Sequence, residues 1–175
     1  MADGWRADKL EADAFMPAVK RIMGPLLLVA SSDLEDQREN TDLRVLVARD
    51  QRIAVRVRRG TDLEKYGHEF TLRLSRRSGV ATELQKIAAG WGDWFFYGWG
   101  DYEKGKLLAF RVLSLAAFRQ RIIVNIPPVT ASDQPNRDES SSFRAYRARE
   151  FPRPCVVLEG CVKEHQRHWV RANDG

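Results

Sequence analysis

The segment that most constrains the fold is WFFYGW at residues 94–99, because polar and apolar positions do not alternate along it. A short run of aromatic residues between glycines is typical of a strand. A strand that is apolar on both faces has to be covered on both sides, which places it inside a sheet. The run therefore predicts a central, buried strand whose aromatic side chains belong to the core. Trp91 or Trp99, at its ends, is the aromatic residue that we expect to be exposed.

Other segments alternate with a period of two or repeat with a helical period, which predicts the remaining elements. Strands are predicted at 42–48, 52–59, 68–75, 106–113, 143–148 and 155–160, and helices at 13–28, 82–90 and 114–123. The turn Asp50-Gln51 is short enough for a hairpin, so the first three strands are expected to form an antiparallel meander. The predicted fold class is α+β (α/β-like), with a central mixed β-sheet flanked by helices.

Composition changes along the chain predict three regions. Residues 1–126 are expected to form the core. Residues 127–142 are rich in Pro, Ser and Asp and predict a loop or linker. Residues 143–175 predict C-terminal strands followed by a mobile tail.

Charge points toward anionic partners. The net charge is +5, and most of the 29 basic residues are arginine, which binds phosphate and carboxylate in a bidentate way. The spacing of Cys155 and Cys161 does not fit a zinc site and predicts two free thiols on or beside a strand. GPLLLVA is too short for a membrane span or a secretory core, so we expect a soluble, cytoplasmic protein without membrane contact. The oligomeric state stays open, and a dimer is one possibility.

The stretch NTDLRVLVARDQRIAVRVRR, residues 40–59, resembles the core of the PD-(D/E)XK nuclease superfamily, notably its Holliday-junction-resolvase-like members. In that superfamily an Asp opens one strand, and the next strand carries Glu-x-Lys. The Asp and the Glu hold Mg²⁺, and the Lys positions water or stabilises charge. The resemblance covers roughly residues 13–100 and implies a restriction-endonuclease-like core. The chain also resembles small bacteriophage proteins, which would place it in the cytoplasm of a bacterial host.

The resemblance assigns the metal-binding Asp to Asp42, the Glu position to Arg56 and the Lys position to Arg58. Asp13 or Glu11 matches an acid that the preceding helix often supplies. A guanidinium offers Mg²⁺ no oxygen ligand and repels it, so the two-acid metal site is expected to be degenerate. The second acid of the metal site can also lie on a neighbouring element in this superfamily. In that case Glu69, or Glu83 together with Lys86, could replace it, and Mg²⁺ would be the cofactor. The candidate catalytic-site residues are Asp42, Arg56, Arg58 and Glu69.

Arg56 and Arg58 lie two apart on one strand, so they share a face and could hold phosphate. The alternative is that Arg56 pairs with Asp42 and that the other arginines form a solvated surface. The candidate nucleic-acid-binding residues are Arg52, Arg56, Arg58, Arg59, Arg73, Arg76 and Arg77.

Three functions follow. The first is a nucleic-acid-binding protein, DNA favoured, on a degenerate nuclease fold. The second is an active Mg²⁺-dependent deoxyribonuclease with a migrated acid. The third is a phage inhibitor or counter-defence protein that binds a host protein through the same fold.

Overall fold

The structure is a computed structural model that describes residues 13–24, 51–124, 128–136 and 140–162, and the backbone of 28–30 and 43–45. The chain forms two compact units, Met1–Gln51 and Arg52–Gly175. Asp42, Glu11 and the predicted tail from residue 163 lie outside the described residues. The predicted division at residues 126 and 142 stays a prediction.

In the first unit the described residues form one helix and a pair of short strands. Helix α2, Met16–Met23, has a proline in its first turn, where the missing N–H leaves no hydrogen bond unmade. Strand β1, Leu28–Ala30, pairs in antiparallel fashion with β2, Leu43–Val45. The described partner of β2 is β1. The predicted hairpin between residues 42–48 and 52–59 stays a prediction, because residues 46–50 lie outside the described residues.

The second unit is built around a four-stranded mixed sheet in the order β3-β5-β6-β9. Its strands are β3, Ile53–Arg59; β5, Trp94–Asp101; β6, Lys106–Ser114; and β9, Val156–Cys161. Strand β5 runs parallel to β3 and antiparallel to β6. It is buried from Phe95 to Gly100, as the apolar run predicts. Of the two tryptophans of which one was expected to be exposed, Trp91 is 63% exposed and Trp99 is buried, with 1% exposed.

The parallel pairing of β3 and β5 requires a crossover connection, which the predicted meander did not contain. The chain leaves β3 through the 3-10 turn Gly60–Asp62 and helix α4, Leu63–Tyr66. It then enters β4, Glu69–Arg76, which belongs to a different sheet. A Cβ at Gly60 would clash with a methyl carbon of Leu108 and lie 3.2 Å from the carbonyl oxygen of Gly100, so a larger residue there would require the Leu108 side chain to move. The meander is therefore wrong.

The second sheet is antiparallel, in the order β4-β8-β7. Strand β7, Ala131–Pro135, pairs with β8, Ser141–Arg147. Part of the segment 127–142, which composition predicted to be a loop, is thus an edge strand. Every residue of β7 is exposed, which explains its loop-like composition.

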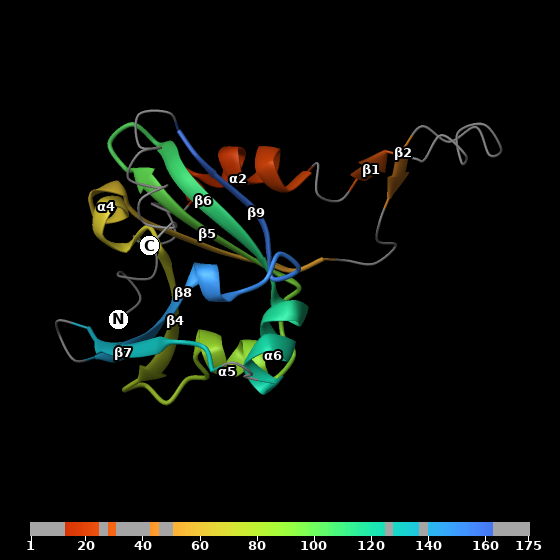
Figure 1. Cartoon of the computed structure of the whole chain (residues 1–175). Helices are drawn as coiled ribbons and strands as arrows, with labels where there is room; N and C mark the ends of the chain where they lie inside the picture. The colour runs from red at the N-terminus through yellow and green to blue at the C-terminus, as the bar shows by residue number, and fades with distance from the viewer. Residues whose placement is uncertain are drawn as a thin grey trace. The chain divides into compact units, whose positions relative to one another are not determined.

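The core lies between the two sheets and is rich in aromatic side chains. Phe70, Phe118, Tyr146 and Phe151 pack with ring centroids 5.3–5.9 Å apart, at distances where edge and offset contacts are favourable. Figure 1 shows helices α5, Glu83–Ala88, and α6, Leu115–Val124, together at one end of the sheets. The predicted α+β class with a mixed sheet is confirmed.

Candidate functional site

Arg56 and Arg58 of β3 point from the first sheet toward the second. Arg56 donates from Nη1 to the carbonyl oxygen of Thr71 at 3.1 Å, and Arg58 donates from Nη1 to the hydroxyl of the same residue at 3.4 Å. Residues two apart on a strand share a face, and here both reach the same position of β4. The sequence pattern correctly placed the two guanidiniums side by side.

Arg56 is held on all sides by protein groups. Its Nη2 lies 2.9 Å from Oε2 of Glu83, and the two side chains are only 18% and 21% exposed. The same carboxylate oxygen accepts the backbone N–H of Arg73 at 3.1 Å, and the Arg56 guanidinium lies 5.4 Å from the ring centroid of Phe143. These contacts tie β3 to β4 and α5. Arg56 is therefore a structural clamp between the sheets, with Glu83 as its counter-ion.

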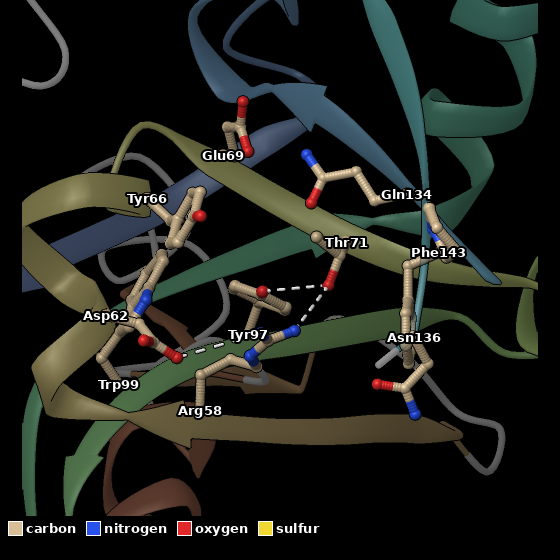
Figure 2. Close-up of a pocket in the computed structure, with 11 residues that line it drawn as sticks. Arg58, Asp62, Tyr66, Glu69, Thr71, Tyr97, Trp99, Gln134, Asn136 and Phe143 are labelled. Carbon is tan, nitrogen blue, oxygen red and sulfur yellow. Dashed lines mark hydrogen bonds and ion pairs between the residues drawn. The ribbon is translucent and has the colours of Figure 1, made fainter. Parts of the chain in front are cut away.

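Arg58 lies on the wall of a cavity of about 400 Å³ in the second unit. Its contacts are longer than those of Arg56: the Thr71 hydrogen bond of 3.4 Å and an approach of Nη2 to Oδ2 of Asp62 at 3.9 Å. Its side chain is 36% exposed. Figure 2 shows Arg58 between Asp62 and Tyr66 on one side and Asn136 and Phe143 on the other. A guanidinium with weak partners on an open cavity is available to an anionic ligand.

The cavity wall comes from both sheets and from the crossover connection. Its other members are Asp62, Tyr66, Glu69, Thr71, Tyr97, Trp99, Gln134, Pro135, Asn136 and Phe143. The hydroxyl groups of Tyr97 and Thr71 are hydrogen-bonded at 3.1 Å. The wall thus combines a cation, hydroxyls, amides and aromatic rings, which suits a polar ligand with a flat apolar part.

Sequence reasoning found Arg58 and Glu69 but missed most of this wall. Gln134 and Pro135 belong to β7, which reads as a loop, and Tyr66 belongs to α4, a helix of four residues. Such short or fully exposed elements carry no hydrophobic periodicity. The Gly-Thr-Asp of the 3-10 turn was the available signal, because a turn there ends β3 and moves Asp62 toward Arg58.

Two carboxylates line the cavity. Asp62 approaches Arg58, and Glu69 lies 3.4 Å from Nε2 of His68 through its Oε1. Within the described part of the chain, His, Cys, Asp and Glu do not form a cluster of three that could hold a metal ion. The convergence of Asp42 with Arg56 and Arg58, and a metal bound to Asp42, remain predictions.

The other predicted arginines lie away from the cavity wall. Arg59, next on β3, is exposed, with its guanidinium 5.9 Å from the ring centroid of Tyr102. Arg52 precedes β3, and its guanidinium lies 5.8 Å from the ring centroid of Trp91. Three more lie on β4 and the turn after it, Arg73 half-buried near Phe143 and Arg76 and Arg77 exposed. None of these five arginines lines the cavity.

A fully buried arginine supports the cavity floor. Arg111 donates from Nη1 to the carbonyl oxygens of Gly67 at 2.5 Å and Glu69 at 3.4 Å. Its Nε donates to Glu159 at 3.1 Å. Burial lowers the pKa of Arg111 to about 10, and the Glu159 carboxylate opposes that shift. Arg111 stays charged at neutral pH and fixes the backbone that carries Glu69.

Comparisons with protein-family models, with curated proteins and with solved structures find no match to this chain. Among the helices that the structure describes, none has the length and apolar character needed to cross a bilayer. The chemistry of the cavity and of its surroundings therefore has to indicate the function.

Proposed function

We propose that this protein binds nucleic acid and that Arg58 is a phosphate contact. The observation that carries the proposal is the difference between two neighbouring arginines on one face. Arg56 contacts Glu83 at 2.9 Å and Thr71 at 3.1 Å, whereas Arg58 lines a cavity of about 400 Å³ with contacts of 3.4 and 3.9 Å. Charge-assisted hydrogen bonds in proteins are usually 2.7–2.9 Å long. A phosphate oxygen would therefore improve on the present partners of Arg58.

The surrounding charge supports the same ligand. Arg59, Arg76 and Arg77 are exposed, and the whole chain carries a net charge of +5. Basic side chains near a binding cavity attract a polyanion without reading its sequence. In this proposal the resemblance to PD-(D/E)XK nucleases describes the ancestry of the site, and the arginines have replaced the metal-binding chemistry. DNA is the favoured nucleic acid.

A metal-dependent nuclease is the second candidate, and the two carboxylates on the cavity wall favour it. Asp62 and Glu69 could offer oxygen ligands to Mg²⁺, as the migrated acid of the superfamily would. The guanidinium of Arg58 opposes this arrangement, because a cation 3.9 Å from Asp62 repels a second cation at that carboxylate. Binding without cleavage is therefore the expected result.

The test compares Arg58→Ala with Lys106→Ala, which removes one exposed positive charge outside the cavity wall. Anisotropy titrations with labelled duplex, single-stranded and branched DNA, each at two salt concentrations, give Kd and its salt dependence. We expect Arg58→Ala to raise Kd about tenfold, since a charge-assisted hydrogen bond contributes roughly 1.5 kcal/mol. The salt slope should fall by about one. Lys106→Ala should change Kd by less than about twofold.

Three results would contradict the proposal. Equal Kd values for the two variants would remove Arg58 from the interface. Cleavage of DNA in Mg²⁺ or Mn²⁺ that is lost in Glu69→Gln would favour the nuclease. Absence of nucleic-acid binding by the wild-type protein would leave the third function, recognition of a host protein.

A further inference from the structure

A second cavity of about 730 Å³ lies beside helix α5, and the residues that line it differ in kind from those of the first cavity. It is lined by Gly79, Ala81, Gln85, Lys86, Ala89 and Trp91. Its one aromatic side chain, Trp91, is 63% exposed. Exposure of that much of a tryptophan costs solvation free energy, because the indole is largely apolar. An exposed indole on a cavity therefore requires an explanation in terms of binding.

The backbone around Trp91 holds the indole in this exposed position. Helix α5 ends in a Schellman motif, in which the N–H of Trp91 bonds to the carbonyl of Lys86 and the N–H of Gly90 to that of Ile87, both at 3.0 Å. Gly90 and Gly92 have φ values of +89° and +79°, which only glycine adopts easily. The residue in the position of Trp91 commonly packs back on its own helix. Here Trp91 lines a cavity together with Gln85 and Lys86 of that helix and stays 63% exposed.

The charge around the indole selects the ligand. Lys86 lines the cavity, the Arg52 guanidinium lies 5.8 Å from the Trp91 ring centroid, and the six residues of the wall include no carboxylate. The turn that leads into Gly79 carries the exposed Arg76 and Arg77. Arg52 also approaches Asp93, its Nε lying 3.6 Å from Oδ2 of that residue. A flat apolar ring with Lys86 and Arg52 beside it matches a base attached to phosphates. An acidic peptide would satisfy the cations but would leave the ring without a flat partner.

We propose that Trp91 is a stacking platform for an unpaired nucleobase, so that the protein prefers single-stranded nucleic acid, or an unpaired segment, to a closed duplex. This inference rests on the proposed nucleic-acid binding and names its substrate class. Bases inside a duplex already stack on their neighbours and cannot cover an indole. Strand β3 connects the two sites: six residues separate Arg52 from Arg58, about 20 Å of strand. A single strand lying along β3 would reach Trp91 with a base and Arg58 with a phosphate.

The experiment measures Kd by anisotropy for labelled oligothymidine and oligouridine of roughly 15 nucleotides, which is within the site size of small single-strand-binding folds. A blunt DNA hairpin without unpaired ends serves as the duplex. The variants are Trp91→Ala, Trp91→Phe, which keeps an aromatic ring, and Arg58→Ala. Ile123→Ala is the matched control, because Ile123 is 81% exposed on α6 and lies outside the cavity wall. Thermal melts establish that each variant is folded.

We expect Trp91→Ala to weaken binding of the single strands by about 5- to 150-fold, the range that loss of one base–aromatic stack produces. Binding of the blunt hairpin should change by less than about twofold. Trp91→Phe should retain most of the single-strand affinity, and Ile123→Ala should retain all of it. The DNA and RNA arms show whether one or both kinds of strand are accepted.

Three results would overturn the inference. If Trp91→Ala binds single strands like the wild type while Arg58→Ala weakens every form, the proposed function stands and the stacking site falls. If Trp91→Ala loses duplex and single strand equally, Trp91 does not select unpaired bases. If the wild-type protein binds none of the oligonucleotides, the proposed function itself fails, and the exposed indole belongs to a protein interface.

Discussion

The ion pair between Arg56 and Glu83 gives the sharpest stability prediction. Their atoms approach to 2.9 Å and their side chains are 18% and 21% exposed, so the pair lies between the surface and the buried classes. Exposed pairs contribute roughly 0.2–1 kcal/mol, whereas loss of one partner of a buried pair costs about 3–5 kcal/mol. We expect Arg56→Met and Glu83→Gln each to lower the free energy of unfolding by about 2–3 kcal/mol. Each leaves a mostly desolvated partner without its counter-charge.

The double variant isolates the pair itself. The second substitution removes a group that the first has already left unpaired. The free energy of unfolding of the double variant should therefore fall by about 3 kcal/mol, which is less than the sum of the losses in the two single variants. The coupling energy is then about 2 kcal/mol. Urea unfolding followed by circular dichroism measures all four proteins, with unchanged m values as the sign that the unfolding transition is the same. A coupling energy under about 0.5 kcal/mol would refute the clamp.

A second pair provides the control for burial. Arg144 and Asp133 join β8 to β7 with two contacts of 2.7 Å, but their side chains are 36% and 48% exposed. The contacts between Arg144 and Asp133 are shorter than the contact between Arg56 and Glu83, whereas their side chains are more exposed. A coupling energy of about 0.5–1 kcal/mol is therefore expected there. If the two cycles give equal energies, burial does not strengthen the inner pair.

Two further predictions concern buried groups. Arg111→Met should lower the free energy of unfolding by about 1–3 kcal/mol in urea titrations, because the carbonyls of Gly67 and Glu69 lose their donor while relief from charge burial offsets part of the loss. The pKa of Arg111, about 10, is below that of an arginine in the unfolded chain. Titration of Arg111 therefore raises the free energy of unfolding of the wild type only above about pH 10, so the difference in this free energy between the wild type and Arg111→Met should be constant from about pH 6 to 9. Burial raises the pKa of Cys155 to about 12, so iodoacetamide should alkylate the partly exposed Cys161 at least roughly tenfold faster, measured by mass spectrometry of digests at about pH 8. Equal rates would contradict the burial of Cys155.

Local patterns in the sequence predicted the elements well where a local physical rule decides them. The apolar run predicted β5 as the central strand, and Thr82 and Gly90 predicted both ends of α5. Thr82 accepts the N–H of Gln85 and donates its own N–H to that side chain, which is a capping box. Gly90 takes the left-handed conformation that ends the helix. Each of these signals lies within four residues of the feature that it predicts.

The prediction of which strands pair was wrong in part, because strand pairing depends on residues that are far apart in the sequence. Strands β3 and β4 are neighbours in sequence, but the turn that begins at Gly60 separates them into two sheets. Strand β7 was missed because all its residues are exposed, so it has no apolar period. One alternative paired Arg56 with Asp42, which lies outside the described residues, whereas the partner that the structure describes is Glu83, on a helix 27 positions away. No spacing rule connects these two residues.

The position of Glu83 bears on the nuclease reading as well as on stability. Glu83 was a candidate for a migrated metal ligand, but its carboxylate already accepts a guanidinium at 2.9 Å and a backbone N–H at 3.1 Å. A divalent cation would have to displace Arg56, which also donates to Thr71. The guanidinium of Arg56 would then lie buried beside the metal ion, which is unfavourable. Asp62 faces the same competition from Arg58 at a longer distance. Arg56 and Arg58 therefore oppose a metal ion at Glu83 and Asp62, whereas Glu69, the second carboxylate of the cavity wall, approaches His68. Arg58 is the cation of the wall that an anionic ligand could contact.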